Sequence, residues 1–202
     1  MLARMTLLLP LLLLLCGQVF AENADFRVQF DVVTTDGPGV FVIKVRRDWS
    51  PNGADRFKEL VESGFYDDTR FFRVIPSFMV QFGISGNPAV STEWRSKTIE
   101  DDAQFPGISN SPGMVSFAKT GAPNSRTTQL FINYANNGNL DGMGFTPFGE
   151  VESGMDIVKK IYPCQERPQQ GRIQSEGNAY LDAEFKDLSK IVSAKVLTGH
   201  EL

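Results

Sequence analysis

Residues 71–83 read Phe-Phe-Arg-Val-Ile-Pro-Ser-Phe-Met-Val-Gln-Phe-Gly, and this stretch is the most informative in the chain. Apolar residues dominate on both sides of Pro76, which predicts two short strands separated at the proline. The alternation places a cation, Arg73, and an amide, Gln81, among aromatic side chains and Met79. The stretch fits either a polar pair set into an apolar binding surface or an ordinary strand whose arginine points into solvent.

Short apolar or alternating runs of this kind recur along the chain. Clusters of Gly, Pro, Asn and Asp separate them, for example at 36–39, 111–113 and 136–138. This punctuation is typical of an all-β sandwich or barrel. The predicted strands cover residues 26–33, 40–45, 70–75, 78–82, 114–118, 129–132, 148–151 and 191–196.

Two segments have helical spacing instead. Ser50 offers an N-cap and Pro51 a first helical residue, and apolar residues then share one face as far as Gly64. Residues 153–161 show a second amphipathic pattern, which Pro163 ends. Two such helices suit the two open ends of a barrel.

The remaining segments are polar. Residues 119–128 form a loop between two predicted strands, and residues 163–180, rich in Gln, Glu, Pro and Gly, predict a long loop before the last strand. The adjacent Asp101 and Asp102 are interpreted as solvated turn residues. Since no linker divides the chain, residues 22–202 are expected to form a single domain.

The first 21 residues are interpreted as a cleaved signal peptide. Arg4 precedes a short apolar run at 5–15, and Val19 and Ala21 place small residues at the −3 and −1 positions of the cut. The run is shorter than the ~20 residues of a membrane helix, so no stable membrane insertion is expected. The predicted location is the secretory pathway, in the endoplasmic reticulum lumen or outside the cell, or the periplasm of a bacterium.

Composition excludes several classes of function. The chain has 202 residues and a net charge of −4 with no basic run, which argues against a nucleic-acid partner. The single histidine, His200, lies two residues from the end, so we expect no histidine-based triad, no metal site and no cofactor. Without the signal peptide Cys164 is the lone cysteine, and it is expected to be buried and inert. A monomer is expected.

Five motifs occur in a fixed order: Phe72-Arg73-Val74-Ile75-Pro76-x-Phe78-Met79-x-Gln81-x-Gly83, Gly113-Met114-Val115-Ser116-Phe117-Ala118, Gln129-Leu130-Phe131-Ile132, Leu140-Asp141-Gly142 and Pro147-Phe148-Gly149-Glu150-Val151. In order and spacing they resemble the cyclophilin family of peptidyl-prolyl cis-trans isomerases. The resemblance implies a closed eight-stranded antiparallel barrel capped by two α-helices. It also implies an enzyme that accelerates rotation about X–Pro bonds, assists the folding of secretory proteins and has proline-containing peptides and proteins as partners.

The resemblance also assigns roles to residues. Arg73, Phe78 and Gln81 would be catalytic, because a guanidinium directed at the proline nitrogen competes with amide resonance and stays charged at any relevant pH. Apolar walls suit the proline ring, and fixed polar groups suit the peptide backbone. The implied substrate-binding residues are Phe72, Met79, Ala118, Lys119, Gln129, Phe131, Leu140 and Phe145.

Three positions depart from the usual groove of that family. Asn139 stands where a tryptophan is usual, just before Leu140. The usual groove histidine falls near Gly144 or Phe145, and Lys119 stands where an asparagine is common. Because a cyclosporin-type ligand contacts that tryptophan, weak cyclosporin binding is expected.

Two other interpretations remain open. The same groove fits a non-catalytic proline-peptide-binding module or a holdase. An unrelated β-barrel, such as a lectin-like ligand carrier, gives Arg73 no special role. The rate at which a proline peptide relaxes from cis to trans separates the enzyme from both.

Overall fold

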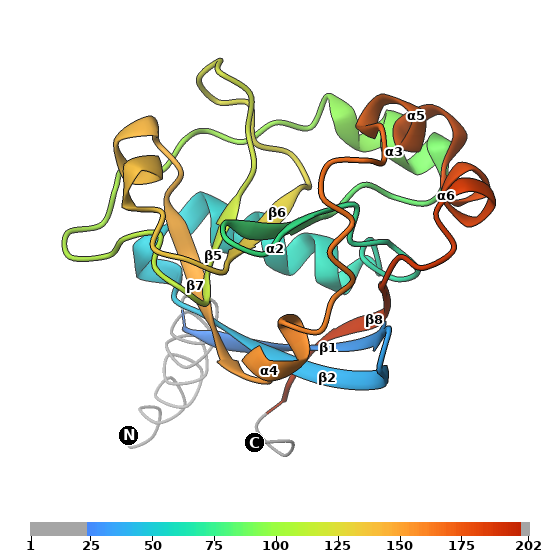
Figure 1. Cartoon of the computed structure of the whole chain (residues 1–202). Helices are drawn as coiled ribbons and strands as arrows, with labels where there is room; N and C mark the ends of the chain where they lie inside the picture. Colours follow the sequence, from blue (N-terminus) through green and yellow to red (C-terminus); the bar gives the residue numbers. More distant parts are fainter. Residues whose placement is uncertain (1–23, 199–202) are drawn as a thin grey trace, which may run out of the picture.

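A computed structural model describes residues 24–198 of the chain. In this part, eight strands pair antiparallel into one sheet in the order β3-β4-β6-β5-β7-β2-β1-β8 (Figure 1). All eight predicted strands are confirmed, with ends shifted by a few residues. They are β1 (Phe26–Thr34), β2 (Gly37–Val45), β3 (Arg73–Ile75), β4 (Met79–Phe82), β5 (Met114–Phe117), β6 (Leu130–Asn133), β7 (Pro147–Ser153) and β8 (Lys190–Val196). The predicted signal peptide, residues 1–21, and His200 lie outside the described residues.

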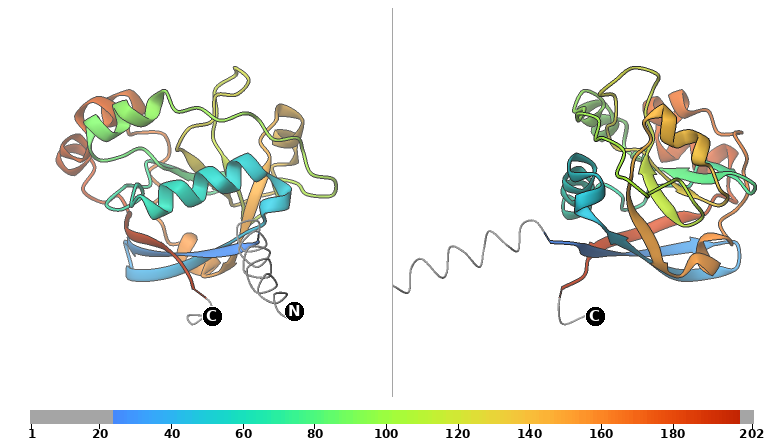
Figure 2. Two further views of the ribbon diagram at one scale, coloured as in Figure 1. Left: turned by 180° about the vertical axis from the view of Figure 1, so that it is seen from behind. Right: turned by 90° about the vertical axis from the view of Figure 1, so that its left-hand side faces the viewer.

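The expected closed barrel is wrong, because the two edges of the sheet do not join in a ladder. Strand β8 meets the chain just before β3 through a single bridge, Arg70 to Lys190. Strand β3 has only three residues, and its free edge instead pairs through Val74 with Gln165. The sheet is therefore an open half-barrel, whose curl is visible from the side in Figure 2.

An aromatic core fills the concave side of the sheet. Alternation along β1 buries Val28, Phe30 and Val32. Phe30 lies opposite Phe41 of β2, and their stacked rings are 4.9 Å apart. Phe57 of the helix α2 (Pro51–Glu62) adds a third ring, 6.2 Å from Phe30. Burial of each such ring contributes about 1.5–3 kcal/mol, so this cluster holds α2 on the sheet.

The first predicted helix is confirmed, but its start is capped differently from the expectation. The Ser50 side chain makes no cap bond to the helix. Instead, the Asp102 carboxylate accepts hydrogen bonds from the backbone N–H groups of Asn52 and Gly53, each at 3.0 Å. Asp102 is only 5% exposed and pairs with the buried Arg126 at 3.0 Å. The interpretation of Asp102 as a solvated turn residue is therefore wrong.

The second predicted helix is present as the short α4 (Met155–Val158). Gly154 begins it with φ at +80°, and a Cβ there would lie 2.4 Å from the Val40 carbonyl oxygen. The glycine lets the chain turn directly against β2. Val158 and Ile161 are buried, as the amphipathic pattern predicts.

The predicted long polar loop at 163–180 is wrong over its second half, which is helical. Helix α5 (Gln170–Glu176) packs against α3 (Pro88–Arg95), which the sequence did not predict, and α6 (Asn178–Glu184) packs against α5 (Figure 1). Ile173 of α5 and Leu181 of α6 bury their side chains against Phe72. Spacings of seven and eight residues join Ile173, Tyr180 and Leu181, so one apolar stripe runs through both short helices.

Candidate active site

A groove of about 560 Å³ lies over strands β3, β4 and β6. We call Arg73, Gln81 and Phe131 its floor, and Arg95 of α3 with Gln170 and Gln174 of α5 its helical wall. The structure brings ten of the eleven predicted site residues to the groove. They are Arg73, Phe78, Met79, Gln81, Ala118, Lys119, Gln129, Phe131, Leu140 and Phe145.

Phe72 is the predicted site residue that the structure places elsewhere. It is 1% exposed and packs with Ile84 and Tyr180 in the cluster beneath α5 and α6. Side chains alternate along an extended chain, so Arg73 faces the groove while its neighbour Phe72 faces the opposite side. Phe72 anchors the helical wall from below and does not line the groove.

Strand register aligns the floor. Arg73 lies opposite Gln81 in the β3–β4 pair, and Gln81 lies opposite Phe131 in the β4–β6 pair. Directly opposed residues share one face of a sheet, which brings the three side chains together. Gln81 accepts a hydrogen bond from Arg73 Nη1 at 3.3 Å and donates one to Gln129 Oε1 at 2.9 Å. The floor therefore carries a row of fixed polar groups.

An apolar pocket adjoins this row. Met79, Phe131 and Leu140 are 1%, 5% and 8% exposed, and Phe78 and Phe145 pack against them. The Phe131 and Phe145 rings meet edge to face with centroids 5.8 Å apart. Leu140 comes from η2 (Gly138–Met143), a short 3-10 helix at the rim of the groove. A small apolar ring fits such a pocket, and the hydrogen-bond donors of the polar row lie at the edge of the pocket.

The loop after β5 contributes two further groups. Lys119 is only 10% exposed in its side chain, with Nζ 3.6 Å from Asp101 Oδ2 and 5.8 Å from the centre of the Phe145 ring. The backbone N–H of Ala118 donates to the Gln129 carbonyl at 2.9 Å. That N–H is already used, so the carbonyl of Ala118 is the backbone group left for a ligand.

Several residues at the groove were not predicted. The helical wall adds Arg95, Gln170 and Gln174 to its lining, and Glu166, which does not line the groove, forms an ion pair with Arg73. A local signal exists for α3, because Asn87 caps it and Pro88 follows at the first helical position, as Ser50 and Pro51 suggested for α2. Glu166 has no local signal, since its partner lies 93 positions away in the chain.

Cys164 is fully buried beside this region. Desolvation raises the pKa of its thiol to about 11, which keeps the sulfur protonated and unreactive at neutral pH. Residues 24–198 contain no cluster of three or more His, Cys, Asp or Glu side chains that could hold a metal ion. Within the same range, no helix is long and apolar enough to span a membrane.

Comparison with protein families gives one match that covers most of the chain. The family model for cyclophilin-type peptidyl-prolyl cis-trans isomerases matches residues 30–178. This range includes the groove floor, the apolar pocket and α5. It leaves out β8 and most of α6.

Named relatives are similar over the same region. Peptidyl-prolyl cis-trans isomerase B of Escherichia coli (strain K12) is 37% identical over 130 residues, which cover 61% of this chain and 78% of that protein. Peptidyl-prolyl cis-trans isomerase A of Dickeya dadantii is 34% identical over 142 residues, or 66% and 72%. Peptidyl-prolyl cis-trans isomerase-like 1 of Aspergillus fumigatus is 33% identical over 133 residues, or 65% and 81%.

A solved structure shares the fold. The crystal structure of a Cryptosporidium parvum cyclophilin-type peptidyl-prolyl cis-trans isomerase matches with a TM-score of 0.60. The match covers 87% of this chain and 99% of that one, at 20% sequence identity. At this identity the likeness shows the fold alone.

Proposed function

The chain belongs to the cyclophilin-type peptidyl-prolyl cis-trans isomerases and acts on proline-containing peptides and proteins; we propose that Arg73 and the apolar pocket beside it carry out this reaction. The observation that supports the proposal is the hydrogen-bonded row Arg73–Gln81–Gln129 at the edge of the pocket. It puts a permanently charged planar donor next to a site shaped for a small apolar ring.

Rotation about an X–Pro bond requires no nucleophile, metal ion or proton transfer. An X–Pro bond rotates over tens to hundreds of seconds unaided, behind a barrier of ~18–20 kcal/mol that amide resonance sets. Rotation forms and breaks no covalent bond and moves no proton. A catalyst therefore has to reduce the double-bond character of the C–N bond and hold the proline while the preceding residue turns.

Each group of the site has a role in that task. Arg73 donates to the proline nitrogen as its lone pair leaves conjugation, and this contact exists only in the twisted transition state. Gln81 keeps the guanidinium in place. Met79, Phe131 and Leu140 enclose the ring and exclude water, which strengthens the donor's effect. Gln129 and the Ala118 carbonyl bind the peptide on either side.

The test is the cis-to-trans relaxation of an Ala-Pro peptide. Arg73→Ala should lower kcat/KM about 100-fold, the scale of losing a preorganised donor. Arg27→Ala is a matched control: Arg27 is 30% exposed against 27% for Arg73, and it also binds a glutamate at 2.6 Å, but it does not line the groove. Equal rates for wild type and Arg73→Ala would contradict the proposed role of Arg73. Peptide binding without any acceleration would favour the proline-peptide binder or holdase.

Cyclosporin-type ligands should bind weakly. Asn139 is exposed on η2 and is not a groove-lining residue, so the large ring contact expected from a tryptophan there is missing. We expect Asn139→Trp to tighten cyclosporin binding in a titration followed by tryptophan fluorescence. Tight binding by the wild type, unchanged in the variant, would contradict this.

The physiological task we propose is folding assistance in the secretory pathway or the periplasm. Its support is the N-terminal pattern of residues 1–21 together with the isomerase site. Mass spectrometry of the exported protein should find Glu22 as its first residue. Retention of Met1 on a cytosolic protein would exclude this location.

The monomeric state is tested separately by sedimentation, with the mass of one chain as the expected result.

A further inference from the structure

The chain after Ile161 is tied to the outer edge of β3. Val74 and Gln165 exchange two backbone hydrogen bonds, both N to O at 3.0 Å. Cys164 is buried on one side, and Arg167 on the other bonds back to the Cys164 carbonyl, Nε to O at 3.1 Å. The residue between them, Glu166, is therefore held in a defined place beside Arg73.

The backbone at Gln165 has an uncommon conformation. Its φ is +60°, in the left-handed region that residues other than Gly, Asn and Asp rarely adopt. Such a conformation persists only where the surrounding contacts impose it, and it is more frequent at functional sites. Here the surrounding contacts are the two backbone hydrogen bonds to Val74, and the side chain of the next residue, Glu166, reaches Arg73.

Glu166 contacts one edge of the Arg73 guanidinium. Its Oε1 lies 2.6 Å from Nε and 2.5 Å from Nη2. Gln81 binds on the other side, at Nη1. A guanidinium has five N–H donors, so these contacts still leave the outer hydrogens of Nη1 and Nη2 for a ligand. Glu166 and Gln81 together orient the guanidinium of Arg73 and leave its outer N–H groups available to a ligand.

We infer that Glu166 is a positioning residue, which holds the guanidinium of Arg73 in the orientation that presents its outer N–H groups to the substrate proline. The inference rests on the proposed role of Arg73. An arginine side chain has many rotamers, and fixing it before the substrate arrives removes an ordering cost from the reaction. Because the donor acts on the twisted peptide bond, the gain falls on kcat and leaves KM nearly unchanged.

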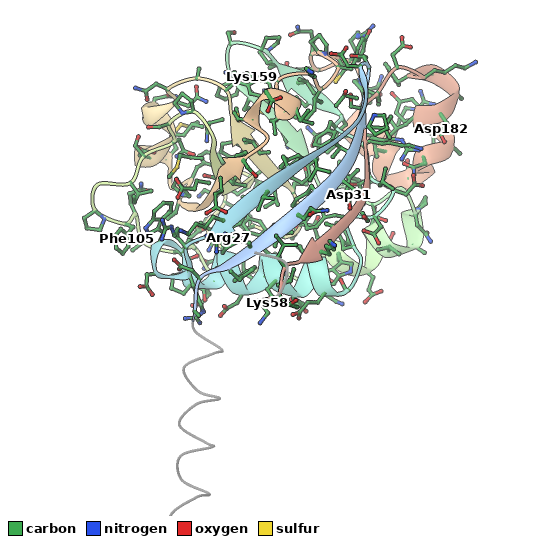
Figure 3. The ribbon with its side chains drawn as sticks, turned by 90° about the horizontal axis from the view of Figure 1, so that it is seen from below. Arg27, Asp31, Lys58, Phe105, Lys159 and Asp182 are labelled. Atoms are coloured by element: carbon green, nitrogen blue, oxygen red, sulfur yellow. The ribbon has the colours of Figure 1, made fainter. Side chains whose placement is uncertain are left out.

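The chain offers a matched control in the pair Arg27–Glu152. Glu152 Oε2 also lies 2.6 Å from an arginine Nε, and Oε1 lies 2.8 Å from Nη2. Figure 3 shows Arg27 on β1, on the underside of the molecule. Neither partner lines the groove. Glu152→Gln thus removes a comparable carboxylate without touching the site.

Kinetics with the Ala-Pro peptide test the inference. Glu166→Gln should lower kcat about fivefold, or ~1 kcal/mol at the upper end for an exposed ion pair, and change KM by less than about twofold. Glu152→Gln should leave both unchanged. About 1 M salt should lower the wild-type kcat toward that of Glu166→Gln and leave the variant nearly unaffected, because salt screens exposed pairs.

A spectroscopic measurement follows the guanidinium itself. In nuclear magnetic resonance spectra, the Nε–H of Arg73 should exchange slowly with water in the wild type and in Glu152→Gln. It should exchange rapidly in Glu166→Gln, because the acceptor has lost its charge. Glu166 is 62% exposed, so the variant should fold like the wild type.

The double variant Arg73→Ala/Glu166→Gln separates the possible failures. Because Glu166 is inferred to act through Arg73, we expect the double variant to be no slower than Arg73→Ala alone. A further loss in the double variant would mean that Glu166 acts elsewhere, and a wild-type or raised kcat in Glu166→Gln would exclude positioning. An unchanged rate in Arg73→Ala would instead overturn the role of Arg73.

Discussion

The floor and the helical wall of the groove are built in different ways. The floor residues sit opposite one another in adjacent strands, and Gln81 and Phe131 are 7% and 5% exposed. In the helical wall, α5 rests on a small cluster beneath it that includes Phe72 and Ile173, whereas Trp94 of α3 packs against the main core. Strand register leaves the floor little freedom, whereas the wall is held by the side-chain packing of its two helices.

This difference separates two properties of the enzyme, the rate of the chemical step and the preference for long substrates. The floor presents the donors and the apolar pocket, so changes there should reduce the chemical step for every substrate. The wall adds the side chains of Arg95, Gln170 and Gln174 to the groove lining, and we expect the part of a long substrate beyond the proline to contact them. Changes there should therefore affect long substrates more than short ones.

After Arg73→Ala, the largest effect should come from a second change at the same floor residue, Arg73→Lys. Lysine keeps the positive charge but lacks the planar fork that binds Gln81 and Glu166 together. We expect kcat/KM for the Ala-Pro peptide to fall about 30-fold with no change in thermal stability. A near wild-type rate would show that charge alone is sufficient.

The next effect should be a loss of stability when the substitution Gly177→Ala disturbs the packing at the end of α5. Gly177 joins α5 to α6 with φ at +65° and ψ at −150°, and a Cβ there would lie 2.1 Å from the Gly86 carbonyl oxygen. The substitution should destabilise the protein by about 2 kcal/mol in urea unfolding. Gly171→Ala is the control, since a Cβ at Gly171 meets no atom within 4 Å. Equal stability of the two variants would contradict a tightly docked wall.

A modest effect should come from the wall side chain in Gln174→Ala. The variant should leave the rate for a short Ala-Pro peptide unchanged. It should lower kcat/KM about threefold for an unfolded protein substrate, the scale of one hydrogen bond. Ser175→Ala, one residue along α5 and outside the groove, is the control. Equal losses of kcat/KM for the short peptide and the unfolded protein would show that the wall, like the floor, acts on every substrate.

The smallest effect should be an acid dependence at the rim. Burial by itself raises the pKa of Asp141 in η2, but hydrogen bonds from Ser109 and Asn110 outweigh it and lower the pKa. The stabilisation is then complete above the unfolded-state value of about 3.9 and is lost as the pH falls through the lower folded value. Asp141→Asn should flatten thermal stability against pH between about 2 and 5. An unchanged profile would exclude Asp141 as its source.

The sequence predicted the floor well because short-range patterns determine it. Alternation around Pro76 puts Arg73 and Gln81 on one face, and the motif that contains Phe131 adds the apolar side. The same alternation rule assigns Phe72 to the other face. The resemblance named Phe72 as a site residue, so on this point the local pattern was the better guide.

Helices α5 and α6 and the open edge of the sheet were missed for a different reason. Helices α5 and α6 have seven residues each, too few to show a clear amphipathic period within polar surroundings. The apolar stripe of Ile173, Tyr180 and Leu181 becomes meaningful only once Phe72 and Ile84 are known to be its partners. In the same way, nothing near Asp102 shows that it caps a helix fifty positions earlier.

The sequence by itself determined the eight strands, the first helix and the identity of the groove floor. Alternation and turn chemistry act between near neighbours, so they can be recognised in one chain. Only the tertiary structure decided that the sheet stays open, that Gln165 takes the free edge of β3 and that Glu166 reaches Arg73. Those contacts join residues about ninety positions apart, and their free energy depends on which surfaces folding brings together.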